Sequence, residues 1–232
     1  MIHIRRSLER GYENKGWLQT YHTFSFDTYY DPQFLGYHSV RVINEEILQG
    51  GKGYGAHFHK EIELITYVLE GILEYQDNAG RTGVIRPGEV QLLSAGTGIT
   101  HNEYNLSQHL PVHFIQIWVE PEQFGGEATY AQKLFSSAAK WGQWRLLISN
   151  NGREGSLRVH QDFDLYTTLL EEKEVIAFPA LEDRYYWVQV ISGKFFVQDL
   201  LLEAGDGASL INESTIEFKC IEGGELLFLD QA

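Results

Sequence analysis

The chain has a single cysteine, Cys220, and only 5 prolines among its 232 residues. One thiol excludes an intrachain disulfide framework and is typical of a reducing compartment. No run of about 18 apolar residues is present that could cross a membrane as a helix, and the first residues lack the apolar run of a secretory signal. We therefore expect a cytoplasmic protein with no membrane partner.

Basic residues are also scarce, because 18 Lys and Arg are set against 32 Asp and Glu, for a formal net charge of −14. The one local basic feature, formed by Arg5, Arg6 and Arg10, we interpret as a solvated edge. Binding to a phosphate backbone depends on clustered Lys and Arg, so the composition argues against direct nucleic-acid binding. The acidic charge is compatible with a protein partner.

Glycine and aromatic residues are plentiful, with 23 Gly and 13% aromatic residues in a chain that is 43% hydrophobic. Many glycines among Val, Ile, Tyr and Phe indicate short strands joined by tight turns, so we expect an all-β fold. The strongest strand signals lie at 39–43, 63–69, 72–76, 89–93, 112–119, 143–148 and 157–160. Residues 1 to about 35 are predicted to be an irregular segment packed by aromatic side chains, and 131–139 either a short helix or an extended crossing.

The second half of the chain repeats the first. Superposing the two strand-turn-strand units matches Gly71 with Gly193, Val68 with Val190 and Gln76 with Gln198, together with most apolar positions. Repetition of this kind favours a duplicated β-barrel. We predict two domains, residues 1–135 and 136–232, and a monomer in which the two barrels cover each other's exposed sheets.

Two short clusters, His57-Phe58-His59 and His101-Asn102-Glu103, each space two good metal ligands by one residue. Residues i and i+2 of a strand share a face, so two such strands side by side would place three imidazoles and one carboxylate around one point. This ligand set suits first-row transition metals, whereas Ca²⁺ and Mg²⁺ prefer mostly oxygen. We predict a metal site formed by His57, His59, His101 and Glu103.

The repeat supports this prediction, because the second half has no ligand at the corresponding positions. His57 and His59 align with Pro179 and Leu181, and His101 and Glu103 align with Phe218 and Cys220. We therefore expect a metal-binding N-terminal barrel and a C-terminal barrel without metal ligands. Cys220 is interpreted as a small apolar filler.

The motifs Gly51-x5-His57-x-His59-x3-Glu63 and Gly98-x2-His101-x3-Asn105 resemble the two cupin motifs. More narrowly, residues 22–32, 57–71 and 94–103 resemble the pirin family, and chiefly its bacterial members. The likeness covers nearly the whole chain. It implies two cupin barrels, which are double-stranded β-helix (jelly-roll) folds, with metal in the N-terminal one only.

The resemblance also implies a ligand set and an activity. Carried onto this chain, the pirin ligands are the same four residues, and Glu63, which binds metal in other cupins, becomes a second-shell residue or an alternative ligand. The implied cofactor is one divalent transition metal, preferably Fe, with Cu, Ni, Mn, Co and Zn as alternatives. Some pirin relatives are quercetin 2,3-dioxygenases, which open a flavonol with O₂ and release CO. In that scheme Glu103 is also the general base that takes the flavonol proton.

Two alternatives stay open. The first is a non-enzymatic metal- or redox-sensing regulator that binds a partner protein. The second is a zinc-type cupin isomerase or metal-dependent binding module, which the absence of a basic cluster beside the ligands disfavours. Among the remaining residues, His22 is interpreted as packing or hydrogen bonding, and either His113 or Gln116, which point to opposite faces, could line the barrel. His38 and His160 are interpreted as satisfied or exposed histidines.

Overall fold

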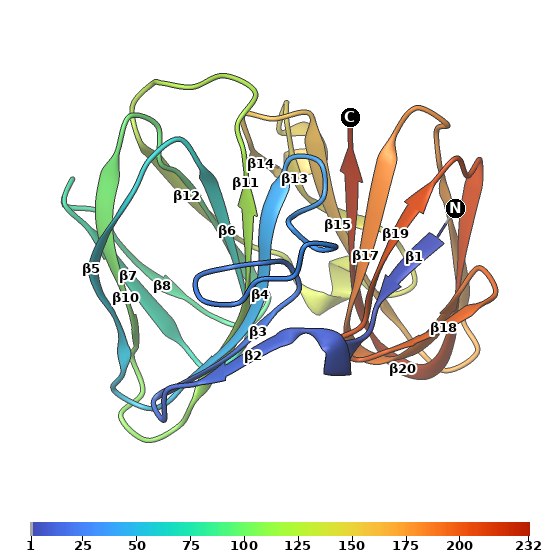
Figure 1. Cartoon of the computed structure of the whole chain (residues 1–232), viewed down its shortest axis with the longest axis horizontal. Coiled ribbons are helices and arrows are strands. Elements are labelled where there is room, and N and C mark those ends of the chain that lie inside the picture. Colours follow the sequence, from blue (N-terminus) through green and yellow to red (C-terminus); the bar gives the residue numbers. More distant parts are fainter. Residues whose placement is uncertain (1) are drawn as a thin grey trace. The chain divides into compact units, whose positions relative to one another are not determined.

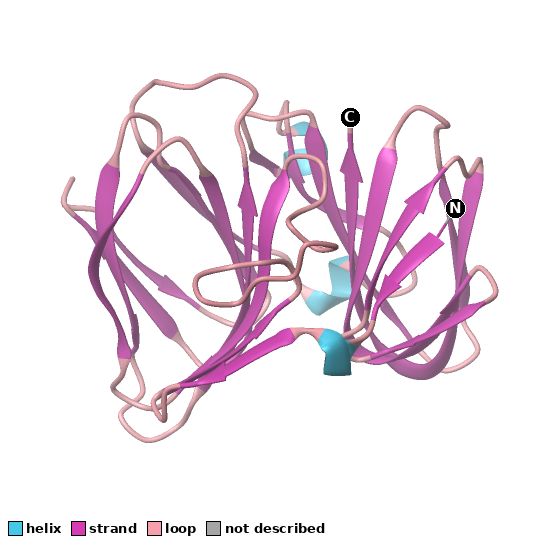
Figure 2. Ribbon diagram, in the orientation of Figure 1, coloured by secondary structure: helices cyan, strands magenta, loops and turns pink. Residues whose placement is uncertain are grey.

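A computed structural model describes residues 2–232 and confirms the predicted all-β class, with strands throughout and only short 3-10 helices among those residues (Figure 2). The strands of the first half are β1 Ile2–Arg5, β2 Gly11–Asn14, β3 Leu18–His22, β4 Val40–Leu48, β5 Gly53–His59, β6 Glu63–Glu70, β7 Leu73–Asp77, β8 Thr82–Ile85, β9 Glu89–Ser94, β10 Ile99–Asn105, β11 Val112–Val119 and β12 Thr129–Leu134. Those of the second half are β13 Arg145–Ser149, β14 Leu157–Arg158, β15 Phe163–Leu170, β16 Val175–Pro179, β17 Tyr185–Val197, β18 Leu200–Glu203, β19 Gly207–Ile211 and β20 Thr215–Gln231. The 3-10 helices are η1 Ser7–Glu9, η2 Ser137–Ala139 and η3 Arg153–Gly155. No helical segment within residues 2–232 is long and apolar enough to span a membrane.

The chain forms two compact units. The first, which we call the N-terminal barrel, comprises Gly11–Phe135 and Val159–Gln161, and the second, the C-terminal barrel, comprises residues 2–10, 136–158 and 162–232. This division differs from the predicted one at the two exchanged segments. Residues 2–10 belong to the C-terminal barrel because β1 pairs with β19, and the 159–161 segment joins the N-terminal barrel because the His160 carbonyl accepts a hydrogen bond from the Glu122 amide. A sequence repeat carries no signal for such exchanges.

The N-terminal barrel is built from two sheets that face each other (Figure 1). One has seven strands in the order β12-β9-β6-β11-β4-β3-β2, and the other has four in the order β5-β10-β7-β8. All neighbours in these two sheets are antiparallel, so side chains alternate between the barrel interior and its outer faces. The two predicted metal-ligand clusters lie on the adjacent strands β5 and β10 of the smaller sheet.

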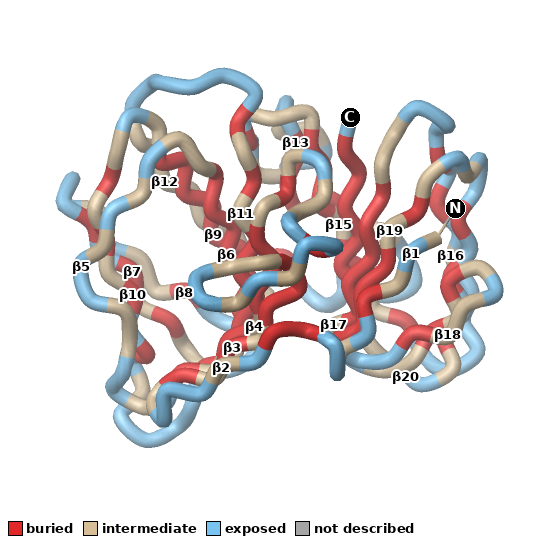
Figure 3. The backbone as a smooth tube through the Cα atoms, viewed as in Figure 1, coloured by how far each residue is buried: buried red, intermediate tan, exposed pale blue. Residues whose placement is uncertain are grey.

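The interior of the N-terminal barrel is apolar at its ends and polar in its middle. Its apolar cluster includes Leu18, Leu48, Val68, Tyr75 and Phe114, all at most 3% exposed. Figure 3 shows the buried backbone running through the strands of the larger sheet. Polar side chains are buried beside this cluster, at Thr20, His22, Asn44, Glu46, Thr66, Gln91, His101, Glu103 and Gln116.

The prediction for the first 35 residues was wrong in part, because β1, β2 and β3 lie there. Strand β3 alternates buried and half-buried residues, but two of its three buried residues are Thr20 and His22. A strand whose inward face is polar shows no hydrophobic alternation, so the pattern could not reveal it. The segment 131–139 combines both predicted possibilities, since β12 extends to Leu134 and η2 follows at Ser137–Ala139.

The C-terminal barrel has a nine-stranded sheet wrapped around an apolar interior. Two positions that align with predicted metal ligands of the first half, Phe218 and Cys220, are fully buried in this cluster. Phe218 packs edge-on against Phe228 with ring centroids 5.3 Å apart, and the Cys220 thiol donates to the Leu170 carbonyl at 3.6 Å. Both side chains therefore act as packing residues.

Candidate metal centre

Strands β5 and β10 pair antiparallel and bring the two clusters together, with His101 opposite His57 and Ile99 opposite His59. The register shifts between His101 and Glu103, so that Glu103 lies opposite Tyr54. This close approach requires glycine at Gly53, where a Cβ atom would lie 2.1 Å from the Glu103 carbonyl oxygen. The glycine-rich segment before the first cluster thus permits the strand contact that assembles the site.

The three imidazoles form one compact group. Their ring centroids are 4.8 Å apart for His57 and His59, 4.3 Å for His57 and His101, and 5.0 Å for His59 and His101. One nitrogen from each ring lies within 4.8 Å of the others. Within residues 2–232 this is the one group of three or more His, Cys, Asp or Glu side chains that could hold a metal ion.

Hydrogen bonding leaves ring nitrogens of this group available. His57 Nδ1 lies 2.8 Å from the Gly55 carbonyl, which can only accept, so His57 carries its proton on Nδ1 and directs the lone pair of Nε2 elsewhere. His59 Nε2 and both His101 nitrogens are buried and have no hydrogen-bond partner within the described chain. Buried polar atoms without partners are rare in native proteins. Three converging imidazoles, two of which have buried nitrogens without partners, fit a divalent metal ion.

The protonation state of these rings also suits a metal. Burial, and then the charge of His57, lowers the pKa of His59 to about 4. Burial, followed by the charges of His57 and His59, lowers the pKa of His101 to about 3 against a smaller opposing effect of Asp77. Both rings are neutral at pH 7, and neutral imidazole is the form that binds metals.

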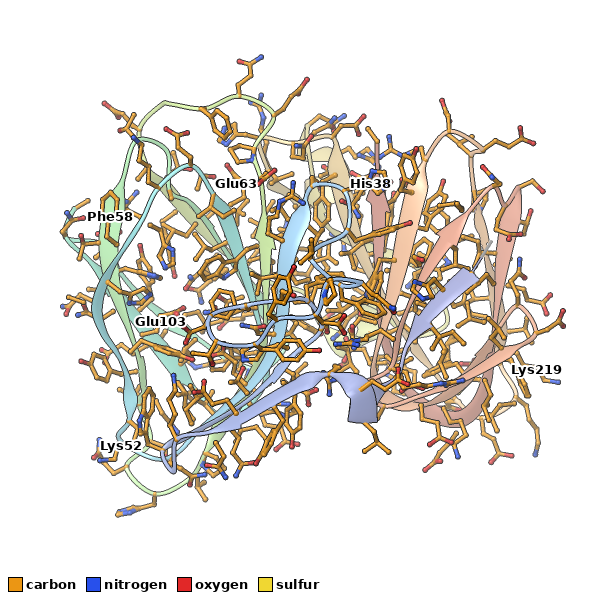
Figure 4. All side chains as sticks on the ribbon, viewed as in Figure 1. His38, Lys52, Phe58, Glu63, Glu103 and Lys219 are labelled. Carbon is orange, nitrogen blue, oxygen red and sulfur yellow. The ribbon has the colours of Figure 1, made fainter. Side chains whose placement is uncertain are left out.

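Glu103 lies on the same inward face of β10 as His101, in the space between the two sheets (Figure 4). Its Oε2 accepts a hydrogen bond of 2.8 Å from Gln116 Nε2, while its Oε1 is buried with no partner among residues 2–232. Gln116 Oε1 in turn accepts from the Trp118 indole at 3.3 Å. Glu103 is not part of the group within 4.8 Å, so its place as fourth ligand stays a prediction.

A second buried carboxylate, Glu46, lies near Glu103. Glu46 accepts a hydrogen bond of 2.7 Å from the Tyr54 hydroxyl. Burial raises the pKa of Glu46 to about 7, although hydrogen bonds from Tyr54 and Asn44 oppose the rise. Burial, and then repulsion from Glu46, raises the pKa of Glu103 to about 8. A nearby cation would favour the ionised form of these carboxyl groups.

The structure places Glu63 away from the imidazoles. It begins β6 on the face opposite the inward residue Leu64, and Figure 4 shows it well separated from Glu103. Its carboxylate accepts from the Ser94 hydroxyl at 2.6 Å and lies 3.1 Å from His160 Nδ1. Glu63 thus contacts His160, which the sequence analysis treated as an isolated histidine. We do not propose Glu63 as a metal ligand.

The structure also locates the other residues that the sequence analysis considered near the site. Of the two candidates on β11, Gln116 faces inward and His113 faces outward, where it lies 2.9 Å from Glu45. His22 is buried and lies 2.9 Å from the Asn44 side chain, which agrees with its expected hydrogen-bonding role.

Sequence reasoning missed Glu46, Tyr54, Tyr75 and Trp118. Tyr75 lies 5.3 Å from His101, and Trp118 lies 4.9 Å from His59, both between ring centroids. The one available signal was Glu46, an acidic residue at an inward position of an apolar strand.

The fold and the site together define a two-barrel cupin protein with a group of histidines fit for a divalent metal in its N-terminal barrel. The pirin family model matches residues 2–119, and a model described as the quercetinase C-terminal cupin domain matches residues 146–231. The chain belongs to the pirin family.

Relatives agree over the full length. Quercetin 2,3-dioxygenase of Escherichia coli K12 is 40% identical over 230 residues, covering 99% of this chain and 98% of that protein. A putative quercetin 2,3-dioxygenase of Pasteurella multocida is 36% identical and covers 99% of both. The solved structure of the bacterial pirin YhhW from Escherichia coli in complex with nickel(II) has a TM-score of 0.95 at 40% identity and covers 100% of this chain and 99% of that one.

Proposed function

We propose that this protein is a metal-dependent dioxygenase that opens flavonols of the quercetin type with O₂ and releases CO. The observation that carries the proposal is the convergence of three imidazoles, with partnerless buried nitrogens on His59 and His101, and a buried, partnerless carboxylate oxygen on the same face of the strand as His101. The full-length relatives named quercetin 2,3-dioxygenase support the choice of reaction. The regulator alternative has no comparable support.

Four side chains would hold the metal. His57, His59 and His101 supply one nitrogen each, and Glu103 supplies the carboxylate oxygen that lacks a partner. When bound, a divalent transition metal would supply positive charge for a substrate oxyanion and a route for electrons to O₂. We propose iron as the native metal, and nickel, which accompanies the solved relative, as the first alternative.

Glu103 would also accept the proton of the flavonol hydroxyl at Oε1, on the lone pair of that oxygen that does not face the metal. The hydrogen bond from Gln116 occupies Oε2 and so turns Oε1 away from Gln116. Because Glu103 is 1% exposed, water does not compete for this oxygen. The deprotonated flavonol ring is then open to attack by O₂, and ring opening expels one carbon as CO.

Aromatic side chains beside the histidines would hold the planar substrate. Trp118 packs edge-on against His59 at 4.9 Å, and Phe26 packs edge-on against Trp118 at 5.1 Å between ring centroids. A wall of flat, weakly polar rings favours a flat aromatic ligand and excludes water from it.

The test is aerobic turnover of quercetin by protein reconstituted separately with Fe²⁺ and Ni²⁺, followed by O₂ uptake, CO release and loss of flavonol absorbance. We expect CO and O₂ in equal amounts with at least one metal. The matched variants are Glu103→Gln, which should lose turnover, and Glu63→Gln, which should retain it. Absence of CO across both metals would overturn the proposal.

A further inference from the structure

A row of polar side chains crosses the interior of the N-terminal barrel. Six strands of the larger sheet each contribute one residue in direct register, in the order His22, Asn44, Gln116, Thr66, Gln91 and Gln132. Residues directly opposite each other on antiparallel strands share a face of the sheet. Since Gln116 reaches Glu103, the whole row faces the barrel interior.

Four of the six members of this row have partners. His22 bonds Asn44 at 2.9 Å, and Gln116 bonds Glu103 at 2.8 Å. Gln132 donates to the Val84 carbonyl at 2.9 Å and accepts from the Tyr130 hydroxyl at 2.8 Å. These bonds give partners to His22, Asn44, Gln116 and Gln132. The burial of Thr66 and Gln91 needs a separate explanation.

The two remaining members, Thr66 and Gln91, are neighbours in the row and lack partners among residues 2–232. Both amide atoms of Gln91 and the hydroxyl of Thr66 are buried without a hydrogen bond in the described structure, although Gln91 is 0% and Thr66 1% exposed. A buried polar group left unpaired destabilises a fold by about 1–3 kcal/mol. Leucine and valine would fill the same space without that cost, so a stability argument does not account for these two residues.

The surroundings indicate which ligand would satisfy them. An amide and a hydroxyl offer both donors and acceptors, which match a hydroxyl group. Tyr130 lies on the same face of β12 as Gln132, the neighbour of Gln91, and it stacks on Tyr75 with centroids 4.6 Å apart. Tyr75 in turn lies 5.3 Å from His101. The pair therefore lies close to tyrosine rings that extend to the histidine group.

The distance between Gln91 and Gln116 indicates how long a ligand must be to reach both. Gln91 is two strands from Gln116, and strands are about 4.8 Å apart, so the two side chains originate about 10 Å apart. A planar ligand of two or three rings spans this distance. Its reacting end would lie beside Glu103 while a hydroxyl on its far ring reaches Gln91.

We propose that Gln91 and Thr66 form a polar subsite that binds a ring hydroxyl of a polyhydroxylated planar aromatic substrate. The inference rests on the proposed function, because it places the reacting end of the same substrate at the histidine group. It assigns substrate selection to the larger sheet, whereas the candidate metal ligands lie on the smaller one.

The test compares two ligands that share the reacting hydroxyl. Quercetin also carries hydroxyls on its outer rings, whereas 3-hydroxyflavone carries none there. Anaerobic binding of each to Ni²⁺-loaded protein is measured by titration calorimetry for the wild type, Thr66→Val and Gln91→Leu. We expect the wild type to bind quercetin more tightly than 3-hydroxyflavone. Either substitution should reduce this preference, measured as the dissociation constant of 3-hydroxyflavone divided by that of quercetin, about tenfold, which is the effect of one or two lost hydrogen bonds.

Stability supplies the second readout. Gln91→Leu should leave the melting temperature unchanged or raise it, because it removes an unpaired amide. The matched control is Gln189→Leu in the C-terminal barrel, where the amide of a residue 2% exposed donates to the Gly205 carbonyl at 3.1 Å and the Asp206 carbonyl at 3.2 Å. That variant should melt at a lower temperature.

The outcomes separate the two proposals. If quercetin is bound and cleaved but Thr66→Val and Gln91→Leu keep the full preference for it, the subsite is wrong and the dioxygenase proposal stands. A fall in melting temperature for Gln91→Leu like that of Gln189→Leu, with unchanged ligand preference, assigns Gln91 a structural role and also overturns the subsite. If the wild type neither binds nor cleaves any flavonol, both proposals fall.

Discussion

Replacing Gln116 by Leu should weaken metal binding without removing a ligand. The side chain is 6% exposed, and its amide donates a 2.8 Å hydrogen bond to the Glu103 carboxylate, a residue that is 1% exposed. A hydrogen bond to a charged group contributes about 1.5–3 kcal/mol, and at about 1.4 kcal/mol per factor of ten this predicts a 10- to 100-fold loss of affinity. Removing a residue that hydrogen-bonds a metal ligand typically weakens metal binding by the same factor, about 10- to 100-fold.

The assay is a competitive Ni²⁺ titration against a chromophoric chelator at pH 7. The matched control is Gln76→Leu, the same change at an exposed position of β7 in the same barrel. We expect the control to bind Ni²⁺ as the wild type does. Equal affinity for Gln116→Leu and the wild type would refute the reasoning that Gln116 presents Glu103 to the metal.

Further results are expected for metal content, for stability and for its pH dependence. His101→Ala should lose most of the metal that co-purifies with the wild type. Glu63→Gln should keep its metal, because the wild-type Glu63 carboxylate contacts Ser94 and His160. Elemental analysis of the purified proteins measures both. Tyr54→Phe should lower the free energy of unfolding by about 1–3 kcal/mol in chemical denaturation, because Glu46 stays buried without its 2.7 Å donor, and the double variant with Glu46→Gln should recover part of the loss. Between about pH 6.5 and 4, metal-free His101→Gln should lose less stability than the metal-free wild type as the pH falls, because the lowered pKa of His101 makes the unfolded wild type bind that proton first. Thermal melts of both proteins at stepped pH measure this difference, and equal pH dependence of the two would contradict it.

Much of the fold was predictable because it follows from local patterns. The strands with alternating or continuous apolar residues, such as β6 and β11, were found, and the match of Gly71 with Gly193 revealed the duplication. Strand β3 was missed because its inward residues are polar. The exchange of residues 2–10 between the barrels depends on pairing between β1 and β19, which are far apart in sequence, and no local pattern encodes it.

The candidate site was likewise predictable in part. The i, i+2 spacing placed His57, His59 and His101 on inward faces, and the structure brings their rings together. Spacing could not show that Gln116 bonds Glu103 or that Glu63 bonds Ser94, because both contacts depend on which strands are neighbours in the barrel. The unpaired Gln91 and Thr66 lie in ordinary strand sequence, and only the register of the sheet identifies them as one row with Gln116.

The central claim is that the N-terminal barrel uses one divalent metal to open a flavonol with O₂. Headspace CO from metal-reconstituted protein and quercetin tests it most directly, with His101→Ala as the metal-site control. We predict one CO for each quercetin consumed by the wild type and none from the variant. Flavonol loss without CO, or equal CO from the wild type and His101→Ala, would contradict the claim.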